Sequence, residues 1–137
     1  MILNNTEIRV RYADTDQMHF VYNGKYLEYF EVGRTEMLRE IGLAYSTIES
    51  KGYQLPVLET YVKFISPAFY DDILIIESYM KEFPSLKIHI DYKIRRKVSN
   101  TLVAEGFTEH VFIKENSKKP SRPPVFFIEI VEPFYQQ

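Results

Sequence analysis

The amino-acid sequence predicts a two-layer α+β domain in which one long helix packs on a curved antiparallel sheet. Two observations lead to this fold class. Apolar residues with helical spacing occur in one long stretch near the start of the chain, and the segments after it have the patterns of strands joined by short turns. The 137 residues are expected to form a single domain over 1–137, because a chain of this length supports one hydrophobic core.

The first strand is expected over residues 6–15, where polar and apolar side chains alternate. The apolar ones stand at even positions from Ile8 to Tyr12, and a period of two indicates a strand with one buried face. Asp14 and Asp16 have the same parity. Both carboxylates are therefore expected to point inward where the strand ends.

The long helix is expected over residues 24–41, where apolar side chains recur every three or four residues. Asn23 is a suitable N-cap, because its side-chain oxygen can accept an unpaired N–H of the first turn. Gly42 is expected to end the helix. A second, shorter helix is predicted at 45–51.

The rest of the chain predicts strands at residues 55–65, 72–81, 87–97 and 101–114. The short turns between them favour an antiparallel meander. In the last strand Ala104, Gly106 and Thr108 share one face, and these small side chains leave room for the long helix. Residues 126–131 are apolar, but so short a segment does not decide between helix and strand.

Composition excludes several classes of protein. With 17 basic and 19 acidic residues the formal net charge is −2, which gives no basis for holding nucleic acid by bulk charge. The chain has no cysteine, so disulfides, thiolate catalysis and Cys-based zinc sites are excluded. It shows neither a signal-peptide start nor a run of about 18 apolar residues, and a soluble cytoplasmic protein without a membrane span is expected.

The strongest functional signal is the segment 11–34. A strand ending in Asp14-Thr15-Asp16 is followed by a tight loop and then by a helix with aromatic residues and the sequence Glu31-Val32-Gly33-Arg34. This segment resembles the 4-hydroxybenzoyl-CoA thioesterase family of hotdog-fold proteins. The similarity in order and spacing extends over about residues 6–125. One departure is His19, which stands where the family usually has Gly.

The resemblance implies an acyl-CoA thioesterase that needs no cofactor. No metal is expected, because the three histidines show no paired spacing with each other or with carboxylates. The enzyme would cleave acyl-CoA, or acyl carrier protein, thioesters to free acid and thiol. Asp16 matches the family's essential carboxylate, which acts either as general base on water or as nucleophile. The N–H of Asn23, together with that of Gly24, is the expected oxyanion donor, since a helix N-terminus offers unpaired amides and a positive dipole end.

Other residues are expected either to contact the substrate or to have a purely structural role. His19 either narrows the loop or enters the substrate channel, and Tyr22 either lines the acyl pocket or belongs to the core. The basic residues Lys118, Lys119 and Arg122 would hold the phosphates of CoA through charge-assisted contacts, or form a solvated loop. The basic run at 95–97 is an alternative phosphate site.

The essential carboxylate also has alternatives. Taken alone, an Asp just before a helix is more often a turn residue, and only the surrounding pattern favours the catalytic interpretation of Asp16. A second hotdog arrangement places the acid on the long helix, at Glu31 or Glu36. Otherwise Glu31 is expected to pair with Arg34, three residues on. Asp14 is expected to shape the loop as a hydrogen-bond acceptor.

The sequence also bears on how the subunits assemble and on which other functions the fold could serve. A sheet with open edges predicts a homodimer or homotetramer, with sites at the subunit interface. Besides the thioesterase, a non-hydrolytic acyl-CoA or acyl-carrier binding protein is possible on the same fold. A hotdog dehydratase is disfavoured, because such enzymes generally pair a His with an acid on the long helix and residues 24–41 contain no His. His110 is expected to be buried and hydrogen-bonded, and His89 to face outward.

Overall fold

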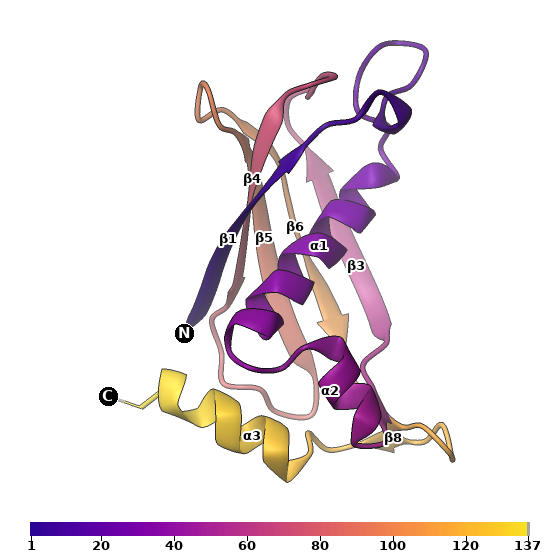
Figure 1. Ribbon diagram of the computed structural model, residues 1–137, viewed down its shortest axis with the longest axis vertical. Helices are drawn as coiled ribbons and strands as arrows, with labels where there is room; N and C mark the ends of the chain where they lie inside the picture. Colours follow the sequence, from indigo (N-terminus) through magenta and orange to yellow (C-terminus); the bar gives the residue numbers. More distant parts are fainter. Residues whose placement is uncertain (137) are drawn as a thin grey trace.

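The computed structural model describes residues 1–136 and shows one long helix lying across a five-stranded antiparallel sheet (Figure 1). The strands are β1 (Ile2–Arg9), β2 (Tyr53–Gln54), β3 (Val57–Phe64), β4 (Ile73–Met80), β5 (Ile88–Arg96), β6 (Leu102–His110), β7 (Phe112–Lys114) and β8 (Pro120–Ser121). The helices are α1 (Lys25–Glu40), α2 (Tyr45–Ser50) and α3 (Val125–Val131), with 3-10 turns η1 (Tyr12–Asp14) and η2 (Glu132–Phe134). No helix in this part of the chain is both long and apolar enough to cross a membrane.

The strand order in the large sheet is β1-β4-β5-β6-β3, and β2, β7 and β8 form a small second sheet. The predicted meander is confirmed for β4, β5 and β6. It is wrong for β3, which pairs with β6 rather than with its sequence neighbour β4. The physical reason is that β1 occupies that side of β4, with Ile8 opposite Leu74, so β3 takes the remaining edge.

The predicted first strand extends too far toward the helix. The observed strand ends at Arg9, and the chain then turns through η1. The backbone N–H of Arg11 donates to the Asp14 carboxylate at 3.1 Å, which closes this turn locally. As a result Tyr12 is 76% exposed instead of buried, whereas Asp14 does point inward and is 3% exposed.

Helix α1 agrees with the prediction to within one residue at each end. Its N-cap is Gly24, without a side-chain hydrogen bond, so the expected capping by Asn23 is wrong: the helix begins one residue later, out of reach of that side chain. Gly42 ends it as expected, with a φ of +89° that favours glycine.

The helix covers only part of the sheet. Gly33 lets α1 approach β4 closely, because a Cβ there would overlap Ser78 Oγ. On β6 the predicted small-residue face also receives the helix: a Cβ on Gly106 would lie 3.1 Å from Phe30, whose ring stacks on Tyr92 at 4.2 Å between centroids. The far edge is less covered, and seven of the eight β3 residues are exposed.

Candidate active site

A tight hairpin connects η1 to α1 and carries most of the predicted site. Thr15 pairs with Val21, and the Asp16 N–H donates to the Phe20 carbonyl at 2.9 Å. The loop between them is three residues long, and its last residue, His19, has a φ of +68°. Loops of this type place a residue in the left-handed region, where glycine is favoured. The backbone therefore explains the glycine that the family usually has at this position.

The carboxylate of Asp16 lies at the tip of this hairpin and is partly exposed. Its Oδ1 accepts hydrogen bonds from the backbone N–H groups of Met18 at 2.9 Å and Phe20 at 3.3 Å. Among residues 1–136, no protein donor contacts the other oxygen, Oδ2. Asp16 thus shapes the loop and still has one carboxylate oxygen available for chemistry.

The start of α1 provides the predicted donors. Within residues 1–136, neither the Asn23 nor the Gly24 N–H donates to a protein acceptor, and the first paired amide is that of Lys25, bonded to the Tyr22 carbonyl at 2.9 Å. These two unpaired N–H groups lie at the positive end of the helix dipole. The Tyr22 ring covers Gly24, where a Cβ would lie 2.8 Å from Cε2. Tyr22 is 59% exposed, so its interpretation as a core residue is wrong.

A cavity of about 230 Å³ opens beside the helix start. Its walls come from the hairpin, the first turn of α1 and the segment after β3, and include Phe20, Asn23, Tyr26, Phe64 and Ser66. Asp16 is not among the lining residues, although its backbone partner Phe20 is. Within one protomer, the predicted oxyanion donor Asn23 therefore lines the cavity, whereas the Asp16 carboxylate lies outside it, on the hairpin beside Phe20.

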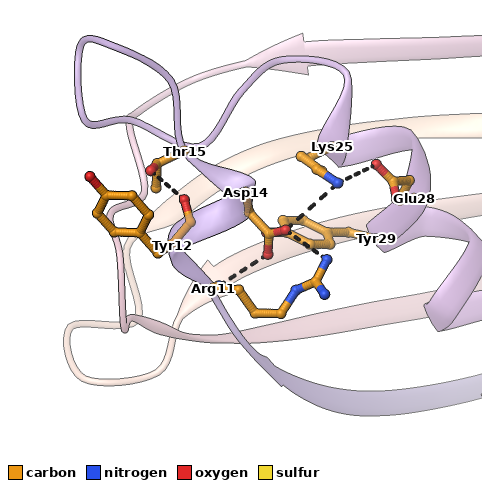
Figure 2. A network of polar contacts seen from close by, with 7 residues as sticks. All are labelled: Arg11, Tyr12, Asp14, Thr15, Lys25, Glu28 and Tyr29. Atoms are coloured by element: carbon orange, nitrogen blue, oxygen red, sulfur yellow. Dashed lines mark hydrogen bonds and ion pairs between the residues drawn. The ribbon is translucent and has the colours of Figure 1, made fainter.

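Asp14 connects η1 to the first turns of α1 through a network of polar contacts, as Figure 2 shows. Its carboxylate accepts hydrogen bonds from Arg11 Nη2 at 3.1 Å and the Tyr29 hydroxyl at 3.0 Å, and Lys25 Nζ lies at 3.7 Å. Burial alone would raise the pKa of Asp14, but the hydrogen bonds from Arg11 and Tyr29 outweigh it and leave that pKa below its ordinary value. Asp14 is thus a charged tie between η1 and α1, in the structural role expected for it.

Residues 10–131 match the profile of the Thioesterase-like superfamily. The chain belongs to this superfamily. YneP of Bacillus subtilis is 32% identical over 120 residues, which cover 88% of this chain and 86% of YneP. The acyl-CoA thioesterase YbgC of Haemophilus influenzae is 30% identical over 129 residues, which cover 93% and 91% of the two chains.

Solved structures of the superfamily agree. The DHNA-CoA thioesterase of Staphylococcus aureus superposes with a TM-score of 0.90 at 31% identity, over 98% of this chain and 89% of that one. A 4-hydroxybenzoyl CoA thioesterase variant bound to 4-hydroxybenzoyl CoA, at 20% identity, shares the fold with a TM-score of 0.85, over 95% of this chain and 99% of that one. The predicted family, hotdog fold and thioester-hydrolase class are confirmed.

One expected ion pair of this thioesterase-like chain is absent. Within residues 1–136, no ion pair joins Glu31 to Arg34, because Arg34 turns toward the sheet, where it lines a cavity of about 30 Å³ with His110. Glu31 remains exposed, and Glu36 pairs with Arg39 instead. Helical spacing alone gave no signal of this orientation, which depends on the polar residues beneath the helix.

The two strand histidines lie as expected. His110 is buried, and its Nε2 lies 2.8 Å from Thr108 Oγ1. Burial, with a smaller effect from the charge of Arg34, lowers the pKa of His110 to about 4. His89 lies on the outer face between Glu109 at 3.0 Å and Asp91 at 3.2 Å.

The basic residues expected to hold CoA phosphates lie at the other end of the subunit. Lys118 Nζ donates to Gln54 Oε1 at 2.9 Å, just before β3, and Lys119 and Arg122 are exposed nearby around β8. The Asn23 cavity is lined by Phe64, at the end of β3, whereas β8 lies near the start of that strand (Figure 1). Since the eight residues of β3 span about 23 Å, a single protomer does not bring the two groups together.

Proposed function

We propose that this chain hydrolyses acyl-CoA thioesters to free acid and thiol, with Asp16 as the essential carboxylate and the Asn23 and Gly24 amides as oxyanion donors. One observation carries the proposal: Asn23, whose N–H has no protein acceptor within residues 1–136, lines a cavity at the start of α1, and the N–H of the next residue, Gly24, is also unpaired there. The acyl-CoA thioesterase activity named for YbgC supports the substrate class. Acyl carrier protein thioesters are the alternative substrate.

The chemistry follows from charge development in the transition state. When the carbonyl carbon is attacked, negative charge forms on its oxygen, and preorganised amides at a helix N-terminus stabilise that charge. Asp16 Oδ2 either removes a proton from the attacking water or attacks the carbon itself. The carbon–sulfur bond then breaks, and the thiolate takes up a proton. In the nucleophilic route the product of this step is a mixed anhydride with Asp16, which a water molecule hydrolyses to release the acid and restore the carboxylate. In a single turnover in ¹⁸O-labelled water, an unlabelled first acid product identifies the nucleophilic route with attack of water on the aspartyl carbon, because the general-base route always places the label in the acid.

A second subunit would complete the site. The uncovered edge strand β3 exposes several large apolar side chains, namely Val57, Leu58, Tyr61 and Phe64. We infer that two β3 edges pair across a two-fold axis, which makes them antiparallel. The start of one β3 then lies beside the end of the other, and Lys118, Lys119 and Arg122 of the partner subunit approach the Asn23 cavity. The working unit in this proposal is a cytoplasmic homodimer or a tetramer of two such dimers.

A panel of short, medium, long and aromatic acyl-CoAs tests the proposal through release of free thiol. The wild-type protein should turn over at least one of them many times, and Glu31→Gln should keep that rate. Loss of activity in Glu31→Gln would instead support the arrangement with the carboxylate on the helix.

The second candidate is a non-hydrolytic acyl-CoA binding protein. It is favoured by the position of the Asp16 carboxylate, which bonds to its own loop and does not line the Asn23 cavity within residues 1–136. Tight binding without thiol release across the whole panel would establish this candidate and contradict the hydrolase.

A further inference from the structure

Two cavities lie along the seam between α1 and β3, and a third lies beneath the later turns of α1. The first is the Asn23 cavity already described, at the start of the helix. The second, of about 270 Å³, lies further along and is lined by Leu27, Glu31, Arg34, Thr60 and Thr108. The third is the small cavity beside His110, and Arg34 lines it too. Because α1 lies mainly over β1 and β4, this side of the helix has one cavity at its first turn and another at Arg34, on either side of the contact between Tyr26 and Phe64.

Arg34 is a half-buried cation that lines two of these cavities. Within residues 1–136 no carboxylate forms an ion pair with it, as is also the case for the half-buried Arg95, whereas Arg9, Arg11, Arg39 and Arg96 each have one. A guanidinium removed from water is costly unless its donors find acceptors. One acceptor for Arg34 is the Tyr92 hydroxyl, and the cavities that Arg34 lines leave room for a ligand to pair with its other N–H groups.

The floor beneath Arg34 is polar and neutral. The Tyr92 hydroxyl lies 2.7 Å from Thr108 Oγ1, which also lies 2.8 Å from His110 Nε2. All three residues are buried. His110 is uncharged at neutral pH, since its pKa is lowered to about 4. Arg34 and Thr108, which both line the second cavity, can thus offer hydrogen bonds to a group that enters it.

We propose that Arg34 is a specificity-determining residue, which selects acyl groups that carry a hydroxyl or keto oxygen toward their far end. This inference rests on the proposed function. Arg34 lies 11 residues after Asn23, about 16 Å along the helix axis, so an acyl chain of roughly a dozen carbons laid along the seam would bring its far end there.

The charges around the second cavity favour a neutral oxygen over a carboxylate. Glu28 and Glu31 line the same cavity as Arg34, and their negative charges oppose a second anion. A hydroxyl can accept from the guanidinium and donate to Thr108 or Glu31 at the same time. A plain alkyl end would leave the guanidinium N–H groups that do not bond to the Tyr92 hydroxyl without an added acceptor, which is the usual basis for rejecting an analogue that lacks a polar group.

Binding of uncleavable analogues tests this without relying on hydrolysis. Two CoA thioethers are compared by isothermal titration calorimetry, one with a dodecyl chain and one with a 12-hydroxydodecyl chain. Wild type should bind the hydroxylated compound about tenfold more tightly or better, the value of a hydrogen bond to a charged group. Arg34→Met should bring the ratio near one. The control Arg39→Met, on the same helix, should leave the affinity ratio unchanged. If Arg34→Met does not fold, Arg34→Gln takes its place.

Each other outcome overturns the inference. Equal binding of the two thioethers by wild type, or an unchanged ratio in the Arg34 variant, would show that Arg34 does not read the acyl group while leaving the hydrolase intact. A variant that loses its dimer on gel filtration but keeps the ratio would assign Arg34 to the subunit interface. Failure of both thioethers to bind wild type would remove the proposed function together with this inference.

Discussion

Asp14→Asn should lower the free energy of unfolding by about 2–3 kcal/mol at pH 7. The carboxylate accepts three hydrogen bonds, two from Arg11 at 3.1 Å each and one from the Tyr29 hydroxyl at 3.0 Å. A hydrogen bond to a charged group is stronger than a neutral one by about 1 kcal/mol, and asparagine removes the charge while keeping the shape. For a chain of this size the loss corresponds to a fall in melting temperature of about 5–10 °C.

The same substitution has a predicted pH dependence. The pKa of Asp14 in the folded protein lies below its ordinary value of 3.8, so its charge stabilises the fold above that value. This stabilisation is lost as the pH falls through the lower, folded-state pKa. The stability difference between wild type and Asp14→Asn should therefore be largest at neutral pH and shrink below about pH 4.

Urea denaturation at pH 7 and at pH 3 measures both effects. The matched control is Asp71→Asn, since Asp71 pairs with Arg9 at 3.1 Å but both side chains are more than half exposed. Such a surface pair contributes about 0.5 kcal/mol or less. If Asp14→Asn is no more destabilising than Asp71→Asn, or if its effect is the same at both pH values, the charged hydrogen bonds of Asp14 do not stabilise the contact between η1 and α1.

Two further substitutions test the site. His19→Gly should raise the free energy of unfolding by about 1 kcal/mol, because glycine adopts the positive φ of residue 19 without strain; His19→Ala, which keeps a Cβ, should not. His19→Gly should also shift the preference for acyl-chain length, and an unchanged preference would place His19 outside the substrate channel. Asn23→Pro removes the proposed oxyanion amide and should reduce kcat about a hundredfold, whereas Asn23→Ala keeps that amide and should stay active. Equal rates in the two Asn23 variants would show that the N–H is not a donor.

Much of the fold could be predicted because local periodicity determined it. The helical spacing that ends at Gly42 gave α1 to within a residue, and the small side chains around Gly106 marked where the sheet receives Phe30. The partner of β3 could not be predicted in this way. Strand pairing depends on which edges other strands have already taken, and the pattern of residues 57–64 contains no information about β1.

The site was predictable where it depends only on the position of a residue in the chain, as for the unpaired backbone amides of Asn23 and Gly24 at the start of a predicted helix. Tertiary contacts decided the rest. Parity placed Asp14 and Asp16 on one inward face, but the turn at η1 buries Asp14 beneath α1 and leaves Asp16 at a hairpin tip. Spacing on the helix likewise predicted a pair for Arg34, whose orientation is set by Tyr92 and His110 from distant strands.

The most direct measurement compares turnover and binding in Asp16→Asn. With the best acyl-CoA of the panel, the account predicts that kcat falls by a hundredfold or more, on the order of the loss of a key catalytic group, while an uncleavable analogue binds with unchanged affinity. Asparagine keeps an oxygen to accept the N–H groups of Met18 and Phe20, so the hairpin should persist. Full activity in Asp16→Asn would contradict the assignment of this carboxylate, and with it the proposed mechanism.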